Sequence, residues 1–155
     1  MKMIGFFLFY LAFVSFPANA AVNVRPFSPA HGMKAVVAVD GQVLTWVINY
    51  GHGDNRDRVV IDTEKNVHID VDDYDFSGRL GFAVWHVDDG MGTYSVYRVF
   101  TFSPSTKKFV ERVPAPQCGD EFVNLRIDKK RHRLLSAFWD GNIPKVCITR
   151  LSPLK

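Results

Sequence analysis

The sequence predicts a single all-β domain of antiparallel strands. Two β-rich runs, 34–39 and 42–50, are separated by Asp40-Gly41, which is a strong hairpin signal. In residues 93–102, apolar and polar side chains alternate, which is typical of a half-buried antiparallel strand. Clusters of turn residues recur about every ten positions, and this spacing favours a sandwich or an incomplete, propeller-like arrangement.

The other predicted strands are short β-rich runs bounded by turn clusters. They are residues 58–62, 67–71, 81–87, 93–102, 108–113, 121–127, 133–138 and 145–151. The turn clusters between them include residues 51–55, 88–90, 103–106, 114–116 and 140–142. No stretch shows helical periodicity long enough to predict a helix, so we expect a meander of strands.

The first 20 residues have the organisation of a cleavable signal peptide. Lys2 gives a short positive start, residues 4–16 form an apolar run, and residues 18–20 have the small-x-small pattern of a cleavage site. The run of about 13 residues is shorter than the roughly 20 that span a bilayer as a helix. An uncleaved anchor is the alternative. We expect export to the periplasm, cleavage after Ala20, and a mature domain of residues 21–155 without membrane contact.

The charge balance argues against a nucleic-acid-binding protein. The chain carries 19 basic and 16 acidic residues, for a net charge of +3. One basic run, residues 129–133, is either a patch for polyanions or a solvated hairpin turn, since it lies between two predicted strands. We therefore expect no nucleic-acid partner.

Two cysteines, Cys118 and Cys147, are the only ones in the chain. In an exported protein an isolated pair of this kind predicts a disulfide bond. Closing a loop of about 30 residues would stabilise the fold by roughly 3–4 kcal/mol. Two buried free thiols, or a metal-binding pair, are the alternatives.

Residues 73–78 have the pattern of the first half of a calcium loop. Oxygen-bearing side chains alternate at Asp73, Asp75 and Ser77, and Gly78 takes the sixth position. No closing carboxylate follows at the expected spacing. The segment is therefore either a weak Ca²⁺ site at Asp73, Asp75 and Ser77 or an acidic β-turn without metal.

Common catalytic motifs are absent from the sequence. It has no Gly-x-Ser-x-Gly elbow, no His-Glu-x-x-His and no Cys-x-x-Cys. The five histidines are scattered without the spacing of metal ligands or catalytic groups. The sequence therefore favours a protein that is not an enzyme.

Loops on a rigid β scaffold are the favoured positions for binding residues. The interface candidates are Asp88, Asp89 and Tyr94 in the loop 88–94, His52 and Asp54 in the loop 50–56, and Trp139 next to a turn. We expect the carboxylates of Asp88 and Asp89 to attract a cationic partner without stabilising the fold. Trp139 either supports the loop 50–56 or closes one end of the core.

Three segments resemble a family of periplasmic β proteins: residues 69–84, 94–97 and 108–110. In that family an Asp-Tyr-Asn-Phe-Asp-Gly-type calcium turn leads into a strand, and a tyrosine-rich strand follows. Its members include immunity proteins that protect xanthomonad-type bacteria from lysozyme-like effectors of type IV secretion systems. The resemblance continues in residues 128–136 and 141–150. The chain departs from the family at Ser77 and Gly81, where the family prefers Asp.

The resemblance implies a propeller-like fold without full closure and a role as a periplasmic immunity protein or inhibitor. Its partner would be a peptidoglycan-hydrolase effector or a lysozyme, whose cleft an exposed loop would block. The alternative is a calcium-stabilised structural or ligand-binding β domain of the cell envelope. A hydrolase is a third, more distant interpretation.

Overall fold

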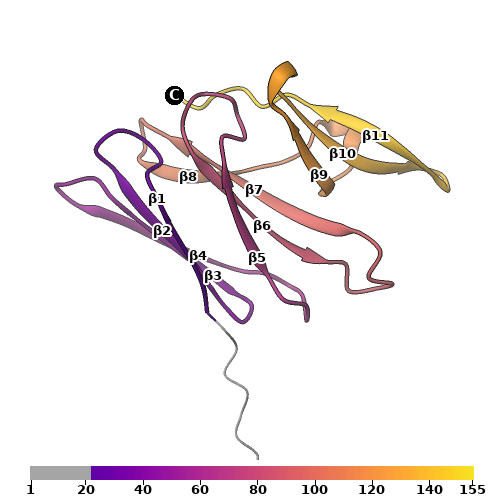
Figure 1. The fold of residues 1–155 in the computed structure, drawn as a ribbon, viewed down its shortest axis with the longest axis horizontal. Coiled ribbons are helices and arrows are strands. Elements are labelled where there is room, and N and C mark those ends of the chain that lie inside the picture. The colour runs from indigo at the N-terminus through magenta and orange to yellow at the C-terminus, as the bar shows by residue number, and fades with distance from the viewer. Residues whose placement is uncertain (1–21) are drawn as a thin grey trace, which may run out of the picture.

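The computed structural model describes residues 22–155, and these residues form two antiparallel sheets (Figure 1). The first sheet has the order β1-β2-β3-β4, with strands β1 (Asn23–Phe27), β2 (Lys34–Asp40), β3 (Val43–Asn49) and β4 (Asp54–Val60). The prediction of an all-β domain is confirmed. The predicted signal peptide and its cleavage site after Ala20 lie outside the described residues.

The second sheet has the order β11-β10-β9-β7-β6-β5, and β8 pairs with β7. Its strands are β5 (His68–Asp72), β6 (Gly81–Val87), β7 (Ser95–Ser103), β8 (Lys108–Arg112), β9 (Phe122–Asp128), β10 (Arg133–Asp140) and β11 (Ile143–Thr149). Figure 1 shows β5, β6 and β7 lying between the first four strands and the group β9–β11. Sequence reasoning missed β1 and began β4 four residues too late.

Turns fall close to where the sequence predicts them. Asp40 pairs with Val43, so Gly41 and Gln42 form a two-residue hairpin turn. Gly41 has a φ of 58°, and a glycine at the first central position is typical of a type II′ turn. The basic run lies at a hairpin turn, because η2 (Lys129–Arg131) is a single 3-10 turn that joins β9 to β10.

An aromatic cluster fills the space between the two sheets. Alternate side chains of β2 and β3 point into it, as expected for strands with one buried face. The ring of Trp46 lies 5.6 Å from that of Phe82 and 5.3 Å from that of Phe100. Phe82 and Phe100 are cross-strand partners on β6 and β7, and their stacked rings are 4.7 Å apart. This cluster holds the first sheet on the second.

A smaller cluster lies on the opposite face of β6 and β7. The second sheet curls, so that side chains of β9 and β10 pack over Ala83 and Val99, which are fully buried. Phe122 on β9 and Leu134 on β10 complete this cluster. Strands β6 and β7 are therefore buried on both faces, which explains why β6 begins with four consecutive buried residues.

The predicted disulfide bond between Cys118 and Cys147 is confirmed, with a Cα–Cα distance of 5.5 Å. It joins η1 (Pro116–Cys118) to the edge strand β11, and both cysteines are buried. The alternatives, free thiols or a metal-binding pair, are wrong because both sulfur atoms belong to the bridge.

We expect the double variant Cys118→Ser/Cys147→Ser to lose about 2–5 kcal/mol of the free energy of unfolding, because the unfolded chain regains its loop entropy. Urea denaturation measured by tryptophan fluorescence checks this. The wild-type protein with its bridge reduced is the control and should lose a similar amount. An unchanged unfolding midpoint in the double variant would contradict the structural role of the bridge.

Candidate functional site

The loop 88–94 connects β6 to β7 and is organised by the carboxylate of Asp88. Its Oδ1 accepts hydrogen bonds from the backbone N–H groups of Thr93 (2.7 Å) and Tyr94 (3.0 Å), and its Oδ2 accepts one from Gly92 (3.3 Å). These N–H groups, that of Tyr94 first, hold the pKa of Asp88 below its ordinary value. Asp88 is only 7% exposed. These bonds correct the expectation that the carboxylate of Asp88 does not stabilise the fold.

Asp89 ties the same loop to the segment that precedes β5. Its Oδ1 accepts hydrogen bonds from the hydroxyl of Thr63 (2.8 Å) and the backbone N–H of Glu64 (3.1 Å). The hydroxyl of Thr63 makes the largest contribution to lowering the pKa of Asp89. Both acidic side chains therefore hold the loop in one conformation.

Tyr94 ends this loop and contacts Trp139 near the end of β10. The two ring centroids are 5.3 Å apart, and Trp139 is 45% exposed. They line a cavity of about 740 Å³ together with Phe138, and the exposed residues Asp120 and Glu121 line the same cavity. We call these five residues the Tyr94–Trp139 surface. It unites two candidates that the sequence placed in separate loops.

The elements around this surface are held by specific contacts. The backbone N–H of Ser95 donates a hydrogen bond to Oδ1 of Asn124 (2.9 Å), which fixes the base of the loop 88–94 to β9. The disulfide bond anchors η1 to β11, immediately before Asp120 and Glu121. The aromatic and the acidic residues of the surface thus stand on parts of the fold with little freedom to move.

Residues 50–56, predicted as a loop, are a turn at 50–53 followed by the start of β4, and they pack on the turn between β7 and β8. Asn55 donates a hydrogen bond from its side-chain amide to the carbonyl oxygen of Lys107 (2.8 Å). The ammonium group of Lys107 lies 4.3 Å from the ring centroid of Tyr50. Asp54 forms an ion pair with Arg56 (2.7 Å), and His52 is exposed.

Trp139 neither supports the loop 50–56 nor closes an end of the core. It lies against Tyr94, on the second sheet, and 45% of its surface is exposed. Both expectations for this side chain are corrected by that position.

The acidic turn 73–78 is stabilised by its own hydrogen bonds. The carboxylate of Asp73 accepts bonds from the backbone N–H groups of Ser77 (3.0 Å) and Gly78 (2.7 Å). The backbone N–H of Ser77 also donates to Oδ1 of Asp75 (3.3 Å). The buried Oδ2 of Asp75 has no hydrogen-bond donor. Among residues 22–155, no three acidic, histidine or cysteine side chains are grouped to hold a metal ion. The calcium hypothesis therefore depends on the unpaired oxygen of Asp75.

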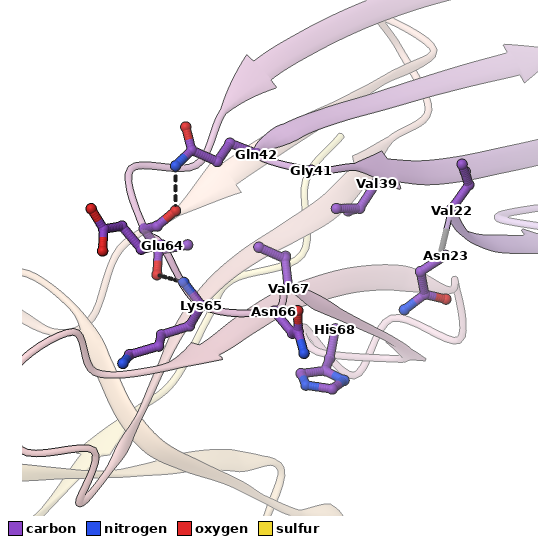
Figure 2. Close-up of a pocket in the computed structure, with 11 residues that line it drawn as sticks. Val22, Asn23, Val39, Gly41, Gln42, Glu64, Lys65, Asn66, Val67 and His68 are labelled. Atoms are coloured by element: carbon purple, nitrogen blue, oxygen red, sulfur yellow. Dashed lines mark hydrogen bonds between the residues drawn. The ribbon is translucent and has the colours of Figure 1, made fainter. Parts of the chain in front are cut away.

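A separate cavity of about 650 Å³ lies where the β2–β3 turn approaches the segment before β5 (Figure 2). Val39 and Val67 form apolar parts of its wall, and Gln42 donates a hydrogen bond to the carbonyl oxygen of Thr63. The charged residues that line it, Glu64 and Lys65, are exposed. None of the described residues that line it is a tryptophan or a tyrosine, the residues that most often dominate interface energies, so the Tyr94–Trp139 surface is the stronger candidate.

The fold and this surface define a small, disulfide-linked, all-β domain with an exposed aromatic and acidic surface. No protein-family model matches the chain, and neither curated proteins nor solved structures give a match. Within residues 22–155, none of the helices has the length and apolar character needed to cross a bilayer.

We expect Asp88→Ala to lower the Tm at pH 7, because three backbone N–H groups lose their acceptor. The pKa of Asp88 is lowered in the folded state, so its contribution is complete above its ordinary pKa of 3.8 and is lost as the pH falls through the folded value. The difference in Tm between variant and wild type should therefore shrink in acid. Calorimetry from pH 7 to pH 2 measures this.

The matched control for that experiment is Asp62→Ala, which removes an exposed aspartate on a connecting segment. It should leave the Tm nearly unchanged at every pH. An Asp88→Ala variant that is as stable as this control would show that the loop does not depend on the carboxylate.

Proposed function

We propose that this protein is a non-enzymatic periplasmic inhibitor or immunity protein that binds a lysozyme-like peptidoglycan hydrolase and blocks its cleft. The observation that carries the proposal is the Tyr94–Trp139 surface, in which a half-exposed indole lies beside carboxylates on a rigid frame. Tryptophan and tyrosine are the residues that most often dominate the energy of protein interfaces. The resemblance of residues 69–84 to immunity proteins supplies the class of partner.

The charge of the surface supports a basic partner. Asp120 and Glu121 are exposed beside the aromatic pair. Enzymes that cleave the anionic cell wall approach it through cationic surfaces, so a negative contact surface would attract them. Electrostatic complementarity of this kind increases the association rate and excludes acidic partners.

The stiffness of the frame supports inhibition by simple blocking. Asp88 and Asp89 fix the loop 88–94, and the disulfide bond fixes η1. Little conformational entropy is then lost on association, which favours tight binding. A blocked cleft excludes substrate without any catalytic group on the inhibitor.

We expect the purified domain to inhibit a lysozyme-like muramidase at a near-equimolar ratio, and Trp139→Ala to weaken binding about 30-fold, which corresponds to roughly 2 kcal/mol for an interface anchor. Turbidity of a cell-wall suspension measures inhibition, and calorimetric titration measures the Kd. The muramidases tested should include any that is encoded beside this protein.

Met91→Ala is the control, because Met91 is an 88% exposed apolar residue in the loop 88–94 that lies outside the Tyr94–Trp139 surface. It should inhibit as well as the wild type. Equal inhibition by the Trp139→Ala variant would overturn the assignment of the surface. If the wild type inhibits none of the muramidases tested, the proposed function is overturned.

The alternative function, a calcium-stabilised structural or ligand-binding domain, is favoured by one observation. Asp75 is 3% exposed, and its Oδ2 has no hydrogen-bond donor. A buried carboxylate oxygen without a partner is costly, and a cation would relieve that cost. The neighbouring oxygens of Asp73 and Ser77 would be the further ligands.

This alternative predicts that Ca²⁺ raises the Tm of the wild type and not that of Asp75→Asn. A site with a Kd of about 1 mM would contribute roughly 1.4 kcal/mol at about 10 mM Ca²⁺. Differential scanning calorimetry with Ca²⁺ and with Mg²⁺ tests it, and Asp62→Asn is the control that keeps the response. No shift in the wild type would leave residues 73–78 as a hydrogen-bonded turn.

A further inference from the structure

The concave face of the second sheet carries a ladder of three stacked rings. His68, Trp85 and Tyr97 are direct cross-strand partners on β5, β6 and β7. The ring centroids of His68 and Trp85 are 4.2 Å apart, and those of Trp85 and Tyr97 are 5.7 Å apart. Because cross-strand aromatic pairs stiffen a sheet, the side chains around this ladder have defined positions.

The ladder orients one carboxylate. The indole N–H of Trp85 donates a hydrogen bond to Oδ2 of Asp70, with a distance of 2.8 Å. No donor within residues 22–155 makes a hydrogen bond to its other oxygen, and Asp70 is exposed on the edge strand β5. Asp70 thus presents a negative charge in a fixed direction with unused acceptor capacity.

A cavity of about 320 Å³ lies beside this carboxylate. The curl of the sheet places Leu125 and Ile127 of β9 in the same cavity as Asp70, Asp72 and Tyr97. Its volume is at the lower end of the range for ligand sites, which suits one side chain better than a large molecule. One wall is apolar, and β5 contributes negative charge.

A lysine side chain of the protein itself already pairs with a carboxylate at this edge. Lys129 extends from η2 and forms an ion pair with Asp72, with an N–O distance of 2.9 Å. Its side chain is 69% exposed, so this pair is open to competition from solvent and from a partner. Burial and then the charge of Asp70 raise the pKa of Tyr97, which agrees with a negative potential in the cavity.

We propose that this cavity binds an arginine side chain of a protein partner. The guanidinium group would pair with Asp70, and its methylene stem would pack on Leu125 and Ile127. Arginine suits such a site because it combines an apolar stem with a planar, permanently charged group that bonds carboxylates and stacks on aromatic rings. The inference goes beyond the proposed function, since this cavity shares no lining residue with the Tyr94–Trp139 surface.

The test is a titration of the ¹⁵N-labelled protein with the blocked peptide acetyl-Gly-Arg-Gly-amide, observed by NMR. We expect a saturable shift of the Trp85 indole N–H resonance, which the spectrum of Trp85→Phe assigns. The same peptide with citrulline in place of arginine keeps the shape and removes the charge, so it should produce no saturable shift.

Three variants make the result specific. Asp70→Asn keeps an oxygen acceptor for the indole and removes the charge, so we expect the affinity to fall about fivefold or more. Lys129→Ala frees Asp72 from its internal cation, so we expect the affinity to rise. Asp62→Asn removes a charge from an exposed aspartate outside the cavity lining and should leave the affinity unchanged.

Each contrary result overturns the inference. Absence of a saturable shift at tens of millimolar peptide shows that the cavity does not take arginine. Equal shifts with the citrulline peptide show that charge does not matter. Equal losses in Asp70→Asn and Asp62→Asn show a general electrostatic effect, and an affinity that falls in Lys129→Ala contradicts the competition between Lys129 and the peptide.

Discussion

The close approach of β6 and β7 at Gly81 is the constraint on which the rest of the structure depends. A Cβ atom at residue 81 would lie 2.2 Å from the carbonyl oxygen of Phe100, so only glycine allows the two backbones to come together. The next residue, Phe82, stacks on Phe100 directly beside this contact. The aromatic cluster packs on one face of β6 and β7, and the smaller cluster packs on the other. The spacing of these two strands therefore fixes the position of the first sheet on one side and of β9 and β10 on the other. The contact also explains why residue 81 cannot supply a closing carboxylate to the acidic turn.

Local patterns were sufficient for most of the fold. The Asp40-Gly41 signal predicts its hairpin because turn chemistry is a property of neighbouring residues. The alternation in residues 93–102 places β7 correctly, but the expectation that this strand is half-buried is wrong, because packing on both of its faces buries residues 99–103 in succession. Strand β1 was missed because Pro26 lowers its β-propensity, and it exists because the whole strand pairs with β2. Strand β4 begins at Asp54, in a polar segment with a turn-like composition, because pairing with β3 extends that far. In both strands, pairing with a neighbouring strand outweighs the local sequence preference.

The candidate surface was only partly accessible to sequence reasoning. Tyr94 and Trp139 were identified one by one as exposed aromatics, but their contact depends on the order β10-β9-β7 in the second sheet. Strand β9 lies between β7 and β10 and connects them, since its residue Val123 is paired with Val96 of β7 and with Ala137 of β10. The burial of Asp88 had no sequence signal, because its hydrogen bonds go to backbone N–H groups, which every residue type except proline has. The pairing of Asp70 with Trp85 likewise requires the register of β5 on β6.

The position of the disulfide bond makes the order of the Tyr94–Trp139 surface depend on the oxidation state of two cysteines. Cys118 lines the same cavity as Tyr94 and Trp139, and the residues that follow it carry the acidic side chains of that surface. With the bridge reduced, the hydrogen bond from the N–H of Ala115 to Thr149 still connects this segment to β11, but the segment after it loses its covalent anchor. The order of this surface is then coupled to the thiol–disulfide potential around the chain. The same amino-acid sequence therefore has a covalently fixed Tyr94–Trp139 surface when the two cysteines are oxidised and a less constrained one when they are reduced.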